Sequence, residues 1–198
     1  MSFLGLKEEY GKCSHCSELC KSRTKVVFGS GAEKAAILFI GEAPGAEEDK
    51  QGIPFCGASG KVLSELLSSI GLTREEIFIT NTILCRPENN RPPQKEEVEN
   101  CRSRLDYLIA LMQPRVIVTI GNFATERILG KKGIMSLRGK IFSTSINGRE
   151  IKVVPVVHPA NLLYNGRNPE ILAQMKQDFQ VIASVIAEKK AQKKLGEF

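Results

Sequence analysis

A pattern of strand, loop and helix that recurs along the chain restricts the fold more than any other feature of the sequence. The apolar run 35–40 leads into the glycine-broken, acidic loop 41–49, and an amphipathic helical stripe follows over 60–70. The same pattern recurs in segments 77–112 and 116–129. Strands that alternate with helices form a mainly parallel sheet with helices on both faces.

The region after residue 140 predicts a hairpin and a closing helix. Segments 141–146 and 151–157 are β-rich and flank Asn147-Gly148, which is typical of a two-residue turn. Asn122 and Asn168 are expected to cap the helices that follow them. We therefore expect an α/β fold: a three-layer α/β/α single domain with a mainly parallel four-stranded central sheet.

Length and charge limit the class of protein. A chain of 198 residues is expected to form one domain over 1–198, in which 1–34 is an N-terminal segment and 188–198 a basic tail. The net charge of +6 favours an anionic partner, above all a nucleic acid. We expect no membrane association, because no apolar stretch approaches the roughly 18 residues that span a bilayer. Because the sequence has no signal-peptide pattern, we expect the protein to lie in a reducing cytoplasm. We also expect it to be a monomer.

The chain has six cysteines, which in a reducing compartment are expected to be thiols or metal ligands rather than disulfides. Three gather near the N-terminus, two are separated by fifteen residues of sequence, and one stands alone. In that order they are Cys13, Cys16 and Cys20, then Cys85 and Cys101, and finally Cys56.

Four side chains should meet at one edge of the sheet, because ligands bind outside the carboxyl ends of parallel strands. Glu42, Asn81 and His158 each follow a strand-like run, and Phe55 lies in a loop rich in proline and glycine. Asn81 offers both a donor and an acceptor, and an exposed aromatic ring can stack on a flat ligand. Together they describe a pocket for a flipped-out base, although a turn asparagine and a structural histidine are the plainer interpretations.

Five short motifs, in this order, resemble those of the iron–sulfur (family 4) uracil-DNA glycosylases. They are Gly41-Glu42-Ala43-Pro44-Gly45, Pro54-Phe55-Cys56-Gly57-Ala58-Ser59-Gly60, Thr80-Asn81, Cys85-Arg86-Pro87 and His158-Pro159-Ala160. The resemblance implies a monofunctional DNA glycosylase that hydrolyses the N-glycosidic bond of uracil in DNA, leaving an abasic site for base excision repair.

The resemblance also implies that Cys13, Cys16, Cys85 and Cys101 hold a [4Fe-4S] cluster, which makes 1–34 the cluster-binding segment. Four thiolates are the normal ligands of such a cluster, but they also suit zinc. The implied role is structural rather than redox, because the cluster would stand apart from the pocket.

For the base, the resemblance implies that His158 bonds uracil O2, Asn81 reads O4 and N3–H, and Phe55 stacks on the ring. Backbone N–H groups around Ala43 and Asp49 would also contact the base.

For the sugar, Glu42 is the implied catalytic carboxylate, which favours the developing cation and positions water. Glu48 and Asp49 are the alternatives for the water-activating role; in a further alternative, no carboxylate activates water and catalysis rests mainly on electrostatics.

DNA would be held by small and basic residues around the pocket. The best candidates for phosphate contacts are Ser59, Lys61, Arg86, Arg91 and Arg167. Leu162 or Leu163 would act as the apolar wedge that fills the space left by the flipped nucleotide. The insertion 164–166 lengthens this loop and leaves the choice of wedge open.

Two other functions are open to this sequence. One is a covalent uracil-binding relative, whose loop after the second strand supplies a nucleophilic histidine; segment 87–94 has none. The other is a non-catalytic iron–sulfur DNA-binding module, which would not need Glu42, Phe55, Asn81 and His158 to converge.

Overall fold

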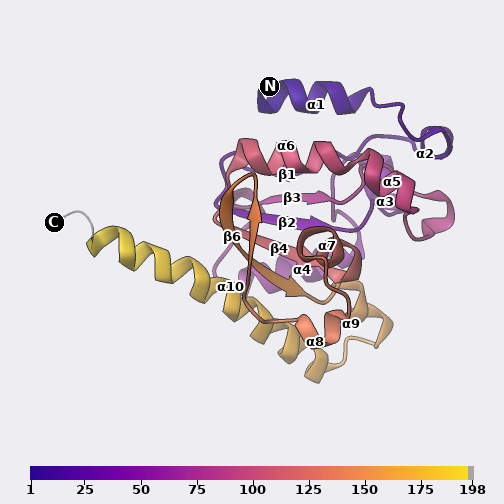
Figure 1. The fold of residues 1–198 in the computed structure, drawn as a ribbon. Coiled ribbons are helices and arrows are strands. Elements are labelled where there is room, and N and C mark those ends of the chain that lie inside the picture. Colours follow the sequence, from indigo (N-terminus) through magenta and orange to yellow (C-terminus); the bar gives the residue numbers. More distant parts are fainter. Residues whose placement is uncertain (196–198) are drawn as a thin grey trace.

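The computed structural model describes the backbone of residues 1–195 and the side chains of residues 1–187. Its centre is a six-stranded sheet in the order β1-β3-β2-β4-β6-β5 (Figure 1). The strands are β1 (Ser30–Gly31), β2 (Ile37–Gly41), β3 (Phe78–Asn81), β4 (Val116–Ile120), β5 (Phe142–Ile146) and β6 (Arg149–Val156).

The sheet is mixed, which corrects the expectation of a mainly parallel four-stranded sheet. The four central strands, β3, β2, β4 and β6, pair in parallel, whereas β1 and β5 add antiparallel edges. Strand β1 has only two residues, too few to produce a sequence pattern. Strand β5 is antiparallel because the turn at Asn147-Gly148 reverses the chain directly into β6.

Helices cover both faces of the sheet. One apolar core contains residues of α1, α6 and α7, and the other contains residues of α4, α9 and α10. The helices are α1 (Phe3–Gly11), α2 (Ser17–Ser22), α3 (Ala46–Gln51), α4 (Ala58–Ser68), α5 (Lys95–Asn100), α6 (Arg102–Met112), α7 (Gly121–Leu129), α8 (Ile134–Leu137), α9 (Ala160–Tyr164) and α10 (Pro169–Leu195), with short 3-10 turns at Arg74–Glu76 and Glu88–Asn90.

Three local predictions differ from the structure. The helical part of segment 77–112 is not one helix but is divided at Cys101 into α5 and α6. Asn122 does not cap α7; its Oδ1 accepts the backbone N–H of Ile134 instead. The loop after β2 contains helix α3, whose polar sequence Ala-Glu-Glu-Asp-Lys-Gln has no apolar stripe to reveal it.

The closing helix begins as expected. The side chain of Asn168 accepts the N–H of Glu170, and Met175, Phe179 and Ile182 are buried against the sheet. The side chains of the predicted basic tail, 188–198, lie outside the described residues. Within the described part of the chain, no helix is both long enough and apolar enough to span a membrane.

Candidate active site

A cavity of about 510 Å³ opens at the carboxyl ends of the parallel strands. Glu42 reaches its wall from the end of β2, Asn81 from the end of β3, and His158 from just beyond β6. Phe55 joins them from the turn between α3 and α4. The structure therefore brings together the four side chains that sequence position placed at one edge of the sheet.

Phe55 stacks on His158, with ring centroids 5.7 Å apart and an interplanar angle of 30°. The backbone of Phe55 is in the left-handed region, with φ 51°, where a bulky residue is strained. Arg74 holds this conformation by donating hydrogen bonds to the carbonyls of Phe55 (2.9 Å) and Pro54 (2.7 Å). Gly60 allows the turn to pack closely, because a Cβ there would overlap the Phe55 carbonyl. The ring is therefore fixed by the surrounding backbone.

Asn81 is buried, with 2% of its surface exposed, and no described residue pairs with its Oδ1. A buried acceptor without a partner costs about 1–3 kcal/mol, so its persistence is typical of a binding group. Gly41 lies beside it, because a Cβ at Gly41 would overlap Asn81 Oδ1 and come within 2.9 Å of the Phe55 ring. The amide thus faces the cavity at a point where only glycine fits behind it.

His158 is held in one neutral tautomer. Its Nδ1 accepts the backbone N–H of Ala160 at 3.1 Å, so the proton of the neutral ring is on Nε2. Burial lowers the pKa of His158, although nearby Glu48 opposes the shift. At neutral pH the imidazole is an uncharged hydrogen-bond donor.

Two carboxylates line the cavity, and a third does not. Burial raises the pKa of the partly buried Glu42. Glu48 is buried on the cavity wall and accepts the N–H of Gly57 at 3.3 Å. Asp49 does not line the cavity: its oxygens accept the N–H of Thr24 at 2.9 Å, and its own N–H is donated within α3. Consecutive helical residues point about 100° apart, so the helical conformation of α3 separates Glu48 from Asp49.

Four cysteines from three segments of the chain, Cys13, Cys16, Cys85 and Cys101, belong to or pack against the same apolar core. The pKa of Cys85 is raised to about 11, mainly by burial and also by neighbouring Cys101 and Cys13, against the opposing effect of Arg23. Burial also raises the pKa of Cys16, again with contributions from Cys101 and Cys13. Cys101 and Cys13 are therefore close enough to influence both Cys85 and Cys16.

The surroundings of these sulfurs suit thiolates. Arg23 donates to Cys85 Sγ at 3.0 Å and to the Cys13 carbonyl at 2.6 Å, and Asn100 donates to Cys16 Sγ at 3.5 Å. Donors aimed at sulfur are the usual second shell of a thiolate-bound metal. Nevertheless, in residues 1–187 no set of three or more His, Cys, Asp or Glu side chains has ligating geometry. The donor set fits a four-thiolate metal centre, but its geometry is not that of a bound metal.

Comparison with known proteins gives the family. Residues 28–180 match the family model for the uracil DNA glycosylase superfamily. The chain belongs to this superfamily. A type-4 uracil-DNA glycosylase of Sulfurisphaera tokodaii is 43% identical over 183 residues, 89% of this chain and 81% of the relative. A type-4 uracil-DNA glycosylase of Archaeoglobus fulgidus is 42% identical over 186 residues, which cover 91% of this chain and 92% of the relative. A type-4 uracil-DNA glycosylase of Thermotoga maritima is 38% identical over 187 residues, which cover 91% of this chain and 93% of the relative.

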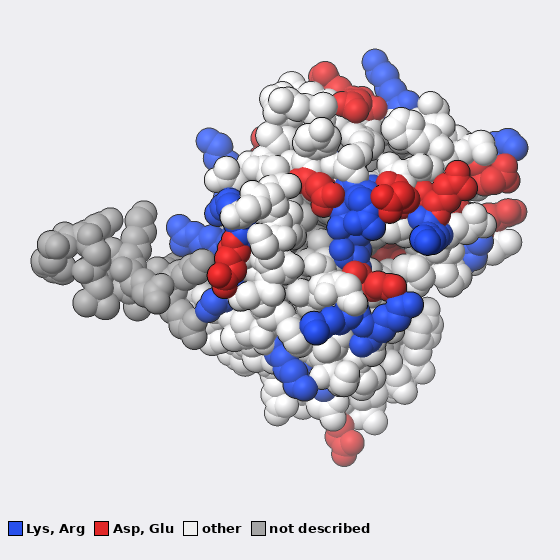
Figure 2. Space-filling view, in the orientation of Figure 1, with Lys and Arg blue, Asp and Glu red and all other residues white. Residues whose placement is uncertain are grey.

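In this superfamily member, all three of the expected phosphate-binding arginines already have protein partners. Arg91 lines the cavity but makes hydrogen bonds to both oxygens of Glu97, at 3.0 and 2.6 Å. Arg86 donates to Asn90, and Arg167 pairs with Glu65 at 2.7 Å. Figure 2 shows positive and negative side chains interspersed on the face drawn, rather than one continuous basic patch.

Ser59 and Lys61, the other expected DNA contacts, both lie on α4. Ser59 lines the cavity, whereas Lys61 is exposed outside it. The superfamily member therefore has Ser59 at the cavity wall and Lys61 as an unshielded cation nearby.

The wedge candidates differ sharply in exposure. Leu162 is completely buried in the core and cannot enter DNA, and Leu163 is partly buried against the same core. Tyr164, in the insertion, is 87% exposed and lines the cavity. Tyr164 and Asn161, which also lines the cavity, were not predicted as site residues because neither lies on a periodic stripe. Their position shortly after His158 is the feature of the sequence that could have indicated them.

Proposed function

We propose that this chain is a monofunctional uracil-DNA glycosylase that takes a flipped-out uracil into the cavity and hydrolyses its N-glycosidic bond. The observation that carries the proposal is the meeting of an unpaired Asn81 amide, a neutral His158 donor and a stacked Phe55 ring in one cavity. Membership of the superfamily and the named activity of the type-4 relatives support it. The product is an abasic site, the starting point of base excision repair.

Asn81 reads the base. Its Oδ1, which has no partner among the described residues, accepts N3–H of uracil, and its Nδ2 donates to O4. Cytosine carries an acceptor at N3 and a donor at position 4, so both contacts become repulsive. A buried polar group left unpaired costs about 1–3 kcal/mol, and this penalty excludes cytosine.

His158 stabilises the leaving base. As the glycosidic bond breaks, the electron pair moves onto uracil and negative charge grows on O2. Because Nδ1 is occupied by the N–H of Ala160, Nε2–H is the donor available to O2. A donor that is already oriented needs no rearrangement as the charge develops, which is the physical basis of oxyanion-type catalysis. Phe55 stacks on the base and fixes its plane.

Glu42 faces the sugar. The sugar becomes cationic as the base leaves, and an anionic carboxylate favours that charge and orients the attacking water. Burial raises the pKa of Glu42, which makes it a stronger base than an exposed glutamate. Glu48 lines the same cavity and is the alternative for the water. Of the backbone groups expected to contact the base, that of Ala43 remains a candidate because Ala43 lines the cavity.

Outside the cavity, Tyr164 fills the gap left by the flipped nucleotide. An aromatic ring that is largely exposed at the cavity rim can stack on the neighbouring bases. Ser59 and Lys61 contact phosphates directly. Arg86, Arg91 and Arg167 can bind a phosphate only in addition to their present hydrogen-bond partners or by giving those partners up.

Cys13, Cys16, Cys85 and Cys101 hold a [4Fe-4S] cluster, for which four thiolates are the normal ligands. When bound, the cluster links the N-terminal segment to the loop after β3 and to the start of α6. Arg23 and Asn100 orient Cys85 and Cys16 through their hydrogen bonds to sulfur.

A cleavage assay tests the proposal. Duplex DNA with one uracil is incubated with the protein, treated with alkali and resolved on a denaturing gel. Cleavage at the uracil position alone, with no break before alkali, is expected. A protein–DNA adduct that resists boiling would favour the covalent relative, and binding without cleavage would favour the non-catalytic module; either result refutes the proposal.

A further inference from the structure

The least expected side chain in the core is Arg104 on α6. It is fully buried, yet no described carboxylate hydrogen-bonds to it. Replacing buried charged groups by apolar residues of similar volume is often neutral or stabilising. Packing alone therefore does not explain an arginine at this position.

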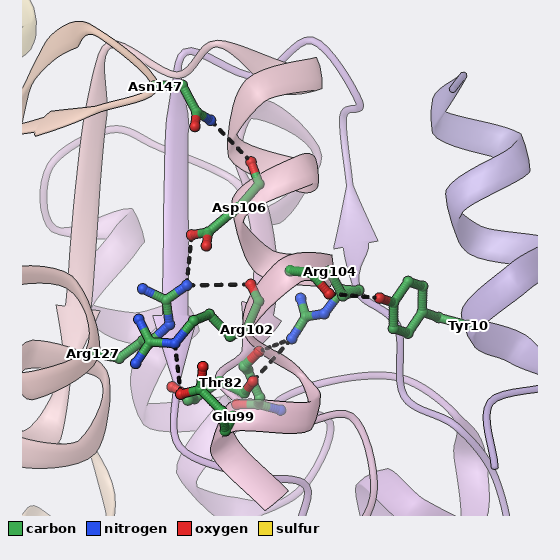
Figure 3. A network of polar contacts seen from close by, with 10 residues as sticks. Tyr10, Thr82, Glu99, Arg102, Arg104, Asp106, Arg127 and Asn147 are labelled. Carbon is green, nitrogen blue, oxygen red and sulfur yellow. Dashed lines mark hydrogen bonds and ion pairs between the residues drawn. The ribbon is translucent and has the colours of Figure 1, made fainter. Parts of the chain in front are cut away.

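The hydrogen bonds of Arg104 all go to three consecutive residues, Thr80, Asn81 and Thr82. Its guanidinium donates to Thr80 Oγ1 at 3.2 Å, to the Asn81 carbonyl at 2.6 Å and to the Thr82 carbonyl at 3.1 Å. Figure 3 shows the side chain reaching from α6 toward Thr82. The middle residue of the three is the one whose amide faces the cavity. We propose that Arg104 is a positioning residue that fixes the Asn81 amide for reading the base.

The geometry around Asn81 explains why positioning is needed. The amide Oδ1 has no described partner, so no hydrogen bond of its own holds it in place. The backbone of Asn81 is held instead by Arg104. Next to it, Thr82 joins the same stretch to β2 by donating its N–H and its hydroxyl to the Gly41 carbonyl. A planar guanidinium can engage several carbonyls at once, which a lysine ammonium on one atom cannot match.

Arg104 also connects two parts of the molecule. Cys101 lies three residues earlier, at the start of α6, and is close enough to affect the pKa of Arg104. Burial lowers that pKa to about 10, so the group remains charged at neutral pH. The helix that carries one of the four gathered cysteines thereby also holds the base-reading residue.

The test is a double-mutant cycle, and it rests on the proposed role of Asn81. Single-turnover rates on uracil DNA are compared for the wild type, Arg104→Met, Asn81→Ala and the double variant. A displacement of about 1 Å can cost on the order of 100-fold in rate, so a loss of this size is expected for Arg104→Met. If Arg104 acts through Asn81, the double variant is no slower than the slower single variant. Losses that multiply would overturn the inference.

Arg127→Met is the matched control. Arg127 is a second arginine in the network of Figure 3, with a side chain only 8% exposed, but its described hydrogen bonds go to Asp106 and the Arg102 carbonyl rather than to β3. Its replacement is expected to lower the melting temperature and to leave the single-turnover rate within about twofold. An equal loss of rate in the control would mean that Arg104 has only a structural role.

Arg104→Lys keeps the test decisive if Arg104→Met fails to fold. DNA with 2-pyrimidinone, which lacks O4 and N3–H, measures how much the Asn81 contacts contribute. The preference for uracil over this base is expected to fall about 10-fold or more in Arg104→Lys at unchanged iron content. An unchanged preference refutes the inference. A wild-type rate for Asn81→Ala would instead refute the base-reading role of Asn81, and is thus a separate failure.

Discussion

The imidazole of His158 lies against the ring of Phe55, with their centroids 5.7 Å apart. The contact joins a residue that follows β6 to a strained turn between α3 and α4, and both residues line the cavity. Because the Phe55 backbone is held by Arg74, and His158 Nδ1 by Ala160, neither ring is free to turn. The surface that we propose stacks on the base and the donor that we propose serves the leaving group are therefore held against each other.

The first prediction concerns His158 and pH. Loss of one preorganised donor costs about 10²–10³-fold in rate, so His158→Ala should reduce single-turnover cleavage by this amount. In the wild type, the rate should fall as the pH drops through the lowered pKa of His158, below the usual value of about 6.5. Protonation would place a hydrogen on Nδ1, which could then no longer accept the N–H of Ala160, so the hydrogen bond that orients the ring would be lost.

The same shift makes a prediction about stability. Because the folded-state pKa of His158 is lowered, its contribution is fully present above the unfolded value of about 6.5 and is lost as the pH falls through the folded value. Urea unfolding across about pH 5 to 8 measures this, and His158→Gln should flatten the dependence in that window. An unchanged slope in His158→Gln would contradict the assignment.

The second prediction concerns Gly41. A Cβ at this position would overlap Asn81 Oδ1 and crowd the Phe55 ring, so Gly41→Ala should displace the amide that we propose reads the base. The single-turnover rate on uracil DNA should fall on the order of 100-fold. Gly11→Ala is the control, because a Cβ there would meet no atom within 4 Å. A wild-type rate for Gly41→Ala would show that the site tolerates a shifted amide.

Sequence position was sufficient to find Glu42, Asn81 and His158 because each ends an apolar run, and parallel strands end at the same edge. Periodicity could not find α3, which has no apolar stripe, and so it could not distinguish Glu48 on the wall from Asp49, which binds the N-terminal segment. Nor could it find Arg104, because a polar residue buried on a helix looks like a surface residue until its partners are known.

The third prediction concerns the wedge. Stacking of an aromatic residue on a base contributes about 1–3 kcal/mol, so Tyr164→Ala should weaken base flipping while Tyr164→Phe preserves it. Fluorescence of 2-aminopurine beside the uracil measures flipping without interference from tyrosine. Leu162→Ala should instead destabilise the fold by about 2–5 kcal/mol, because it opens a cavity in the core. Normal flipping by folded Tyr164→Ala would exclude the wedge role.

The last prediction concerns the four cysteines. Anaerobically purified protein should be brown, with broad visible absorbance from charge transfer between thiolate and iron, and metal analysis should find iron rather than zinc. Cys85→Ser should lose the colour, because it removes one of the four proposed thiolate ligands. Cys20→Ser should keep it, since Cys20 only donates weakly to the Cys13 carbonyl, at 3.6 Å. Zinc in the wild type would refute the cluster while retaining the four-thiolate site. Equal metal content in Cys85→Ser and the wild type would refute the ligand set itself.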